Sequence, residues 1–217
     1  MRVLQLTPLI NYAFSYVSRI TTLFNIDESH GLKHSMDVFH NANQIYNSEV
    51  KEHSYLTNQL DVIYVLAIVH DMCDKKYMNE KSGIKLMNNY MSSYIPQVKL
   101  DVISNIISTM SYSKVKENGF PDLKEYQLAY HIVREADLLA AYDIERCIIY
   151  GMKVEKLDYI AALKRAIQLF DNRVLKYRSN KLFKTKYSKD LSLKLHNKVL
   201  KEIEILKTIY LLDNYIE

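Results

Sequence analysis

The chain contains almost no residues that interrupt helices. Only 4 glycines and 3 prolines occur among its 217 residues, so there are few positions at which tight turns are favoured. Apolar residues recur at a spacing close to that of a helix, and no segment has the sustained alternation of a half-buried strand. Together these features predict an all-α helical bundle with short connections. The length suits one domain with a single sizeable core.

The apolar pattern also predicts where the helices lie. The stretch VIYVLAIV, within residues 55–72, is apolar on every side and is expected to be the central buried helix. Gly119 and Pro121 mark residues 111–123 as the one long loop, and loops of this length often carry function. Residues 124–150 are expected to form one long helix that ends at Gly151. The remaining predicted helices cover about 8–24, 29–47, 77–94, 97–110, 157–178 and 189–212.

Four ionisable residues lie on apolar faces of these helices. His34 shares a stripe with apolar residues four, eight and eleven positions later, and His70 ends the apolar face of the central helix. Asp71 follows His70 directly, and Asp137 is flanked at helical spacing by apolar residues. A carboxylate buried alone is costly unless it is paired or bound to a metal. Imidazole and carboxylate groups suit a divalent transition metal, so the four residues are candidates for one shared cation.

Each of these residues has a simpler interpretation. A His–Asp dipeptide is a short motif that also arises by chance. His34 could be a hydrogen-bonded core histidine, and Asp137 could pair with Arg134 three residues earlier on the same helix. The metal interpretation is favoured because all four residues lie on inward faces.

The segments around these residues carry a more detailed pattern. They are HSMDV (34–38), VLAIVHDMCDKKY (65–77), SYSK (111–114) and READLLAAYDIER (134–146). This pattern resembles the small, single-domain branch of the HD-domain superfamily of metal-dependent phosphohydrolases, over about residues 25–150. The resemblance implies an HD-type helical bundle as residues 1–150, with residues 151–217 as a basic helical extension packed on it. It also implies that His34, His70, Asp71 and Asp137 bind the metal.

The number of metal ions follows from the same comparison. Two-metal members of the superfamily place further histidines between the His–Asp pair and the distal Asp. Here the one intervening histidine is His131, six residues before Asp137 and on a different face of the helix. One divalent ion is therefore expected, with Mn²⁺ as the first choice and Mg, Fe, Co, Ni or Zn as alternatives.

The resemblance further implies a hydrolytic mechanism in which the ion acidifies a water molecule and polarises a phosphoryl group. Asp74, one turn after His70, matches an acidic position of the family and is expected to orient the water or act as general acid/base. Lys76 matches the family pattern and is assigned to the catalytic group. His30 is assigned there as a donor to a phosphate at a helix N-terminus, or it merely helps to cap the helix near Ser29.

Charge that develops on the phosphoryl oxygens needs cationic partners. The candidates for substrate binding are Lys75, Lys114 and Arg134. For each lysine the alternative is a solvated surface charge, and for Asp74 the alternative is an ion pair with Lys76. Glu135 is a weaker candidate for a carboxylate that orients a ligand histidine.

The expected substrate is a small phosphorylated compound, most simply a nucleotide. Pyrophosphohydrolysis of (deoxy)nucleoside triphosphates is the first choice, ahead of nucleoside monophosphate dephosphorylation and phosphodiester cleavage. Residues 151–217 hold 15 Lys/Arg against 8 Asp/Glu, and residues 173–190 interleave these cations with aromatic residues. An alternative of another class is therefore a basic helical nucleic-acid-binding protein with a degenerate site. A homodimer is compatible with the sequence.

The chain is expected to be cytoplasmic and to have no membrane partner. Its 2 cysteines, Cys73 and Cys147, form no CxxC motif, which favours a reducing compartment. The apolar N-terminal stretch is interrupted by Asn11, Ser15 and Arg19, and no signal-peptide cleavage site follows it. No uncharged run of about 18 or more apolar residues occurs, so no segment is expected to span a bilayer.

Overall fold

The computed structural model describes residues 3–213, with side chains from residue 6 to residue 209, and this part of the chain forms helices and no strand. The predicted all-α helical bundle is therefore confirmed. The α-helices are α1 (Val3–Phe24), α2 (Leu32–Glu49), α3 (Leu60–Val69), α4 (Glu80–Met91), α5 (Gln97–Thr109), α6 (Tyr112–Asn118), α7 (Gln127–Ala140), α8 (Ile144–Lys153), α9 (Tyr159–Asn172) and α10 (Lys186–Asp213). Three short 3₁₀ helices are η1 (Ser54–Asn58), η2 (Lys124–Tyr126) and η3 (Val174–Lys176).

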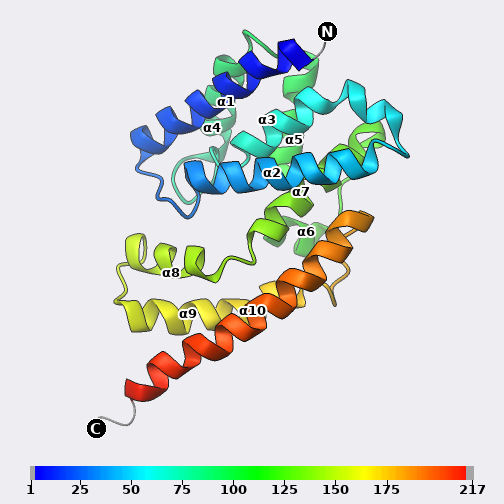
Figure 1. Cartoon of the computed structure of the whole chain (residues 1–217). Coiled ribbons are helices and arrows are strands. Elements are labelled where there is room, and N and C mark those ends of the chain that lie inside the picture. Colours follow the sequence, from blue (N-terminus) through cyan, green and yellow to red (C-terminus); the bar gives the residue numbers. More distant parts are fainter. Residues whose placement is uncertain (1–2, 214–217) are drawn as a thin grey trace.

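Helix α3 is the centre of the bundle, as its composition predicts. Residues 65–69 are all buried, and α1, α2, α5 and α7 pack around the helix. Figure 1 shows α8, α9 and α10 as a second group on one side of this bundle, with α7 leading from one group to the other. Helix α10 returns to contact α2 and α7, so the C-terminal third is packed against the first part of the chain.

The prediction of one long helix over residues 124–150 is wrong. The chain forms η2 and α7, turns at residues 141–143, and continues as α8. Asp143 is the N-cap of α8, and its Oδ1 accepts a hydrogen bond from the backbone N–H of Arg146 at 3.2 Å. A side-chain cap of this kind satisfies a free N–H group and starts a new helix without glycine or proline.

Gly151 lies inside α8, although the sequence pattern predicts it at a helix end. A Cβ atom built on Gly151 would lie 3.0 Å from the Cβ of Ala162 in α9. The glycine therefore permits close packing of α8 on α9. The domain boundary expected at residue 150 also falls inside α8, so no connection separates the two parts at that position.

The expected loop over residues 111–123 is partly helical. Ser111 caps α6, which ends at Gly119 with a positive φ of 74°, a backbone conformation that glycine adopts without strain. The prediction of Ser29 as an N-cap is also wrong. Gly31 is the N-cap residue of α2, and no side-chain hydrogen bond caps this helix. Two other expected helices are shorter, because residues 55–72 divide into η1 and α3, and residues 157–178 divide into α9 and η3.

In the part of the chain that the structure describes, no helix combines the length and apolar character that crossing a membrane requires.

Candidate metal centre

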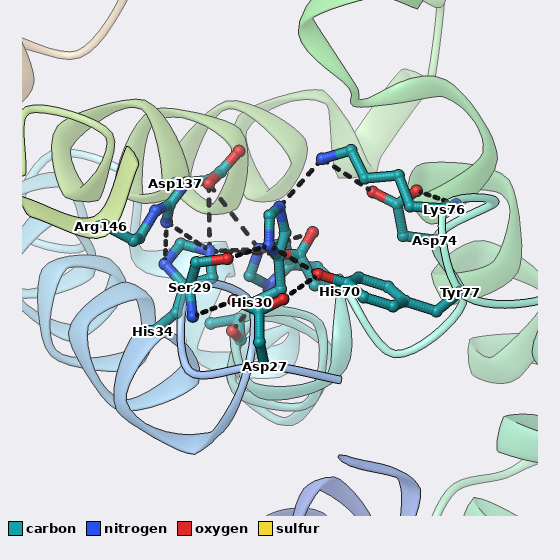
Figure 2. Close-up of polar contacts among 12 residues, drawn as sticks. Asp27, Ser29, His30, His34, His70, Asp74, Lys76, Tyr77, Asp137 and Arg146 are labelled. Carbon is teal, nitrogen blue, oxygen red and sulfur yellow. Dashed lines mark hydrogen bonds and ion pairs between the residues drawn. The ribbon is translucent and has the colours of Figure 1, made fainter. Parts of the chain in front are cut away.

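Three helices bring His34, His70 and Asp137 together. His34 lies in the first turn of α2, His70 is the residue directly after α3, and Asp137 lies in α7. Their ligand atoms all lie within 4.8 Å of one another, and no other such group of three occurs within residues 6–209. His34 Nε2 is 3.2 Å from His70 Nε2 and 3.4 Å from Asp137 Oδ1 (Figure 2). The sequence prediction that these three residues meet is therefore confirmed.

Asp71 touches the same two imidazoles but is not a member of that trio. Its Oδ2 lies 3.2 Å from His34 Nε2, and its Oδ1 lies 3.4 Å from His70 Nε2. The donor set thus consists of two imidazole nitrogens and a carboxylate, with a second carboxylate beside them. This combination fits a divalent transition metal, so the residues present suit the ion that the sequence predicts.

The orientation of His70 also suits a metal ligand. Its Nδ1 lies 3.1 Å from the carbonyl oxygen of Ala67, one turn earlier in α3. A hydrogen bond from Nδ1–H to this carbonyl directs Nε2 at the cluster. Metal-bound histidines are commonly held in this way by a backbone carbonyl.

The two histidines of the cluster hold both of its carboxylates in the charged form. Burial alone would raise the pKa of Asp71, but the charge of His70 and a hydrogen bond from His34 hold it well below its usual range. Burial acts in the same direction on Asp137, and its pKa is likewise lowered by the hydrogen bond from His34 and the charge of His70. Both carboxylates are therefore ionised near neutral pH and are available to a cation.

Arg146 is a close neighbour that the sequence pattern did not identify. Its Nη1 contacts Nδ1 of His34 and lies 3.0 Å from Nε2 of the same ring (Figure 2). On an unbroken helix, Arg146 would follow Asp137 by nine positions, which at about 100° per residue is about half a turn away. The turn at residues 141–143 directs it back to the site. The capping Asp143 was the available signal.

The cluster opens into a cavity of about 330 Å³. His70, Asp71 and Asp137 lie in its wall, and so do Tyr112, Tyr150 and Tyr177. The carboxylates Asp74 and Glu80 also line it, together with six cationic residues: Lys75, Lys76, Lys114, Arg146, Arg165 and Arg173. Arg165, Arg173 and Tyr177 belong to the C-terminal third, which thus contributes directly to the cavity.

The three residues assigned to the catalytic group lie together on one side of this cavity. Lys76 Nζ is 3.0 Å from His30 Nε2 and 3.8 Å from Asp74 Oδ2 (Figure 2). On its other side, His30 Nδ1 is 2.7 Å from the hydroxyl of Ser29. Burial lowers the pKa of His30 to about 3, with the charge of Asp71 opposing it and that of Lys76 adding to it. His30 is therefore neutral near pH 7, and it accepts a hydrogen bond from Lys76.

The substrate-binding candidates divide into two groups. Lys75 lies exposed at the cavity wall, and Lys114 lines it while pairing with Glu80. The assignment of Arg134 to substrate binding is corrected. Arg134 is 2% exposed, does not line the cavity, and donates a hydrogen bond to the carbonyl oxygen of Leu182. Its guanidinium carbon lies 4.8 Å from the ring centroid of Phe120. These contacts direct the long side chain away from Asp137, so it has a structural role.

Glu135 is likewise occupied away from the candidate ligands. Its carboxylate accepts hydrogen bonds from the backbone N–H groups of Lys184 and Thr185 at 2.6 and 3.1 Å, and from the Thr185 hydroxyl at 2.7 Å. It therefore attaches the segment before α10 to α7. His131 lies 3.9 Å from Glu135 and does not join the His–Asp cluster.

Comparisons of the whole chain with protein-family models, with curated proteins and with solved structures gave no match.

Proposed function

We propose that the chain is an HD-type, metal-dependent phosphohydrolase that acts on nucleotides. One observation carries this proposal: the His34–His70–Asp137 cluster opens into a cavity whose wall holds six cationic side chains. A divalent cation site suits phosphoryl transfer, and cations around it balance the charge of a phosphorylated substrate. The resemblance of the surrounding motifs to HD-domain enzymes supports the same reaction class.

In this proposal His34, His70 and Asp137 hold the ion, with Asp71 as a further ligand. The donor set is consistent with Mn²⁺ and with the alternatives named above. When bound there, a divalent ion supplies Lewis-acid chemistry, which polarises a phosphoryl oxygen and lowers the pKa of a water molecule.

The protein side chains have separate roles in the proposed reaction. Asp74 lines the cavity, and one of its oxygens accepts a hydrogen bond from the backbone N–H of Lys76 at 2.8 Å. The carboxylate is thereby oriented to accept a proton from the attacking water. Lys76 and Arg146 neutralise charge on the phosphoryl oxygens. His30 is neutral, so it accepts a hydrogen bond from the Lys76 ammonium and positions it. His30 does not supply a proton in the proposed reaction.

The size and lining of the cavity favour a nucleotide over a nucleic-acid chain. A volume of about 330 Å³ falls at the lower end of small-molecule sites. The tyrosines and the apolar side chains of Ile107, Met110 and Leu169 supply surface for a base or sugar. Pyrophosphohydrolysis of a nucleoside triphosphate remains the first choice, with monophosphate dephosphorylation or phosphodiester cleavage as alternatives.

A hydrolysis screen tests this function. Purified protein, freed of metal and then supplied with Mn²⁺, Mg²⁺, Co²⁺, Ni²⁺, Fe²⁺ or Zn²⁺, is incubated with nucleoside mono-, di- and triphosphates. Release of orthophosphate and of pyrophosphate is measured separately. We expect metal-dependent release from at least one nucleotide class. If no metal supports turnover and the protein instead binds RNA or DNA with a steep salt dependence, the nucleic-acid-binding alternative is correct.

A further inference from the structure

Arg146 and Arg173 line the cavity without the carboxylate partners that three of its other cations have. In that group Lys76 lies beside Asp74, Lys114 beside Glu80 and Arg165 beside Glu155. Arg146 instead contacts the His34 ring. Arg173 donates from Nε to the Tyr177 hydroxyl at 3.0 Å and lies 4.4 Å from the ring centroid of Tyr112. Within the described part of the chain, neither arginine forms an ion pair with a carboxylate.

Tyr177 accepts the hydrogen bond from Arg173 and lines the same cavity as Arg146 and Asp137. Burial raises the pKa of its hydroxyl to about 12, the charges of Arg173 and Arg146 oppose this rise, and the charge of Asp137 adds to it. One hydroxyl is therefore within electrostatic reach of both guanidinium groups and of a candidate metal ligand. The cavity is continuous from Asp137 to Arg173.

Cys147 follows Arg146 in α8 and lines the same cavity. Burial raises the pKa of its thiol and the charge of Asp143 adds to the rise, whereas the charges of Arg146, Arg165 and Arg173 act against it. Three guanidinium groups, from α8, α9 and the residue after α9, therefore line the cavity together with this thiol. Removing unpaired guanidinium groups from bulk water costs free energy unless an anion accompanies them. The planar fork of an arginine matches the geometry of phosphate oxygens.

We propose that Arg146 and Arg173 form a binding site for a chain of two or more phosphates. One phosphate lies at Arg146, beside the His–Asp cluster, and the next lies at Arg173. This inference rests on the proposed phosphohydrolase function and deepens it, because it selects nucleoside di- or triphosphates over monophosphates as the substrate class. It also assigns a role to the C-terminal third, which supplies Arg173.

Anion binding can be measured without metal or turnover. Inorganic tripolyphosphate is titrated into the full-length protein in EDTA, and its affinity is determined by calorimetry. We expect Arg173→Gln to weaken binding about tenfold or more, the effect of losing one charge-assisted contact. Lys176→Gln is the matched control: it removes one positive charge three residues away, at an exposed position outside the cavity. It is expected to change the affinity by less than about twofold.

Cys147 provides a second readout at the site itself. Cys147 is a partly exposed residue of the cavity wall, whereas Cys73, which also lines the cavity, is 1% exposed. Tripolyphosphate should slow alkylation of Cys147 in the wild-type protein and in Lys176→Gln, and should protect much less in Arg173→Gln. Arg173→Lys keeps the charge but loses the fork, and it is expected to bind with intermediate affinity. It replaces Arg173→Gln if circular dichroism shows that the latter does not fold.

Two results would overturn the inference: equal tripolyphosphate affinity in Arg173→Gln and Lys176→Gln, or orthophosphate binding as tightly as tripolyphosphate. The hydrolysis screen can fail independently of the binding measurement. If no nucleotide is hydrolysed but tripolyphosphate binding still depends on Arg173, the phosphate-chain site stands and the enzymatic function does not. If nucleotides are hydrolysed and Arg173 has no effect on binding, the enzymatic function stands and the phosphate-chain site does not.

Discussion

The Nε2 atoms of His34 and His70 lie 3.2 Å apart, although 36 residues separate the two histidines in the sequence. Two imidazole nitrogens at this distance are brought together by the packing of α2 on α3. Asp71 and Asp137 approach the same nitrogens. Several polar groups therefore converge on one point at the edge of an apolar core. Such a site is costly in isolation and is stabilised by a bound cation.

The role of Asp74 is tested by Asp74→Asn. The amide cannot accept a proton from water, so we expect kcat to fall by about 10² or more. Metal affinity should stay within about twofold of wild type, because Asp74 is outside the His–Asp trio. Steady-state kinetics on the best nucleotide of the screen and a metal titration provide the two measurements. Asp122→Asn, which makes the same change at an exposed position outside the cavity, is the control. Equal kcat values in Asp74→Asn and wild type would remove Asp74 from the mechanism.

His131 is expected to make stability depend on acid pH. Burial first, and then the charges of Arg134 and Lys184, lower its pKa from 6.5 to about 4 in the folded protein. The unfolded chain therefore binds a proton below about pH 6.5 that the folded chain binds only near pH 4. The free energy of unfolding that depends on neutral His131 therefore has its full value above about pH 6.5. It falls as the pH drops below that value.

The loss attributable to His131 should reach about 2 kcal/mol between pH 7 and pH 4.5. Urea unfolding at both pH values measures it, with His131→Leu as the comparison. The variant should lose about 2 kcal/mol less stability over this interval than wild type. Equal losses in the two proteins would show that His131 is not neutral in the folded state.

The close contact of α8 and α9 is tested at Gly151. A Cβ at this position would also lie 3.3 Å from the Cα of Ala162, so Gly151→Ala should force the helices apart. Overpacking costs about 1–3 kcal/mol, and the better helix propensity of alanine returns about 1 kcal/mol. Net destabilisation of about 1 kcal/mol is expected in urea unfolding.

Ala162→Gly removes the opposing Cβ and provides the control. In a double-mutant cycle the combined variant should be more stable than the two single effects predict. Additive effects would mean that the two residues are not in contact.

The sequence pattern predicts the helical bundle and the meeting of His34, His70 and Asp137, because both depend on periodic signals. An apolar stripe fixes which face of a helix is buried and therefore which way a short side chain points. For Arg134 the stripe fixes only the direction in which the side chain leaves the helix. Its long side chain ends at Leu182 and Phe120, partners that local spacing does not identify.

The contributions of Arg146 and of the C-terminal third could not be predicted for the same reason. Arg146 reaches His34 across 112 positions of sequence, through a turn that has no glycine or proline. Arg173 reaches the cavity because α9 packs closely on α8 at Gly151. Tertiary contacts of this kind are set by how the helices pack, and composition showed only that this third of the chain is basic.

Direct measurement of metal binding tests the central claim. Metal-free protein is titrated with Mn²⁺, and the unbound ion is followed by its electron paramagnetic resonance signal. We predict that wild type binds one ion per chain and that the His70→Ala/Asp71→Ala variant binds none at that site. His40→Ala, at an exposed position of α2, should bind as wild type does. Undiminished Mn²⁺ binding by a folded His70→Ala/Asp71→Ala protein, or the absence of binding by wild type to Mn²⁺ and to each of the other proposed ions, would contradict the account.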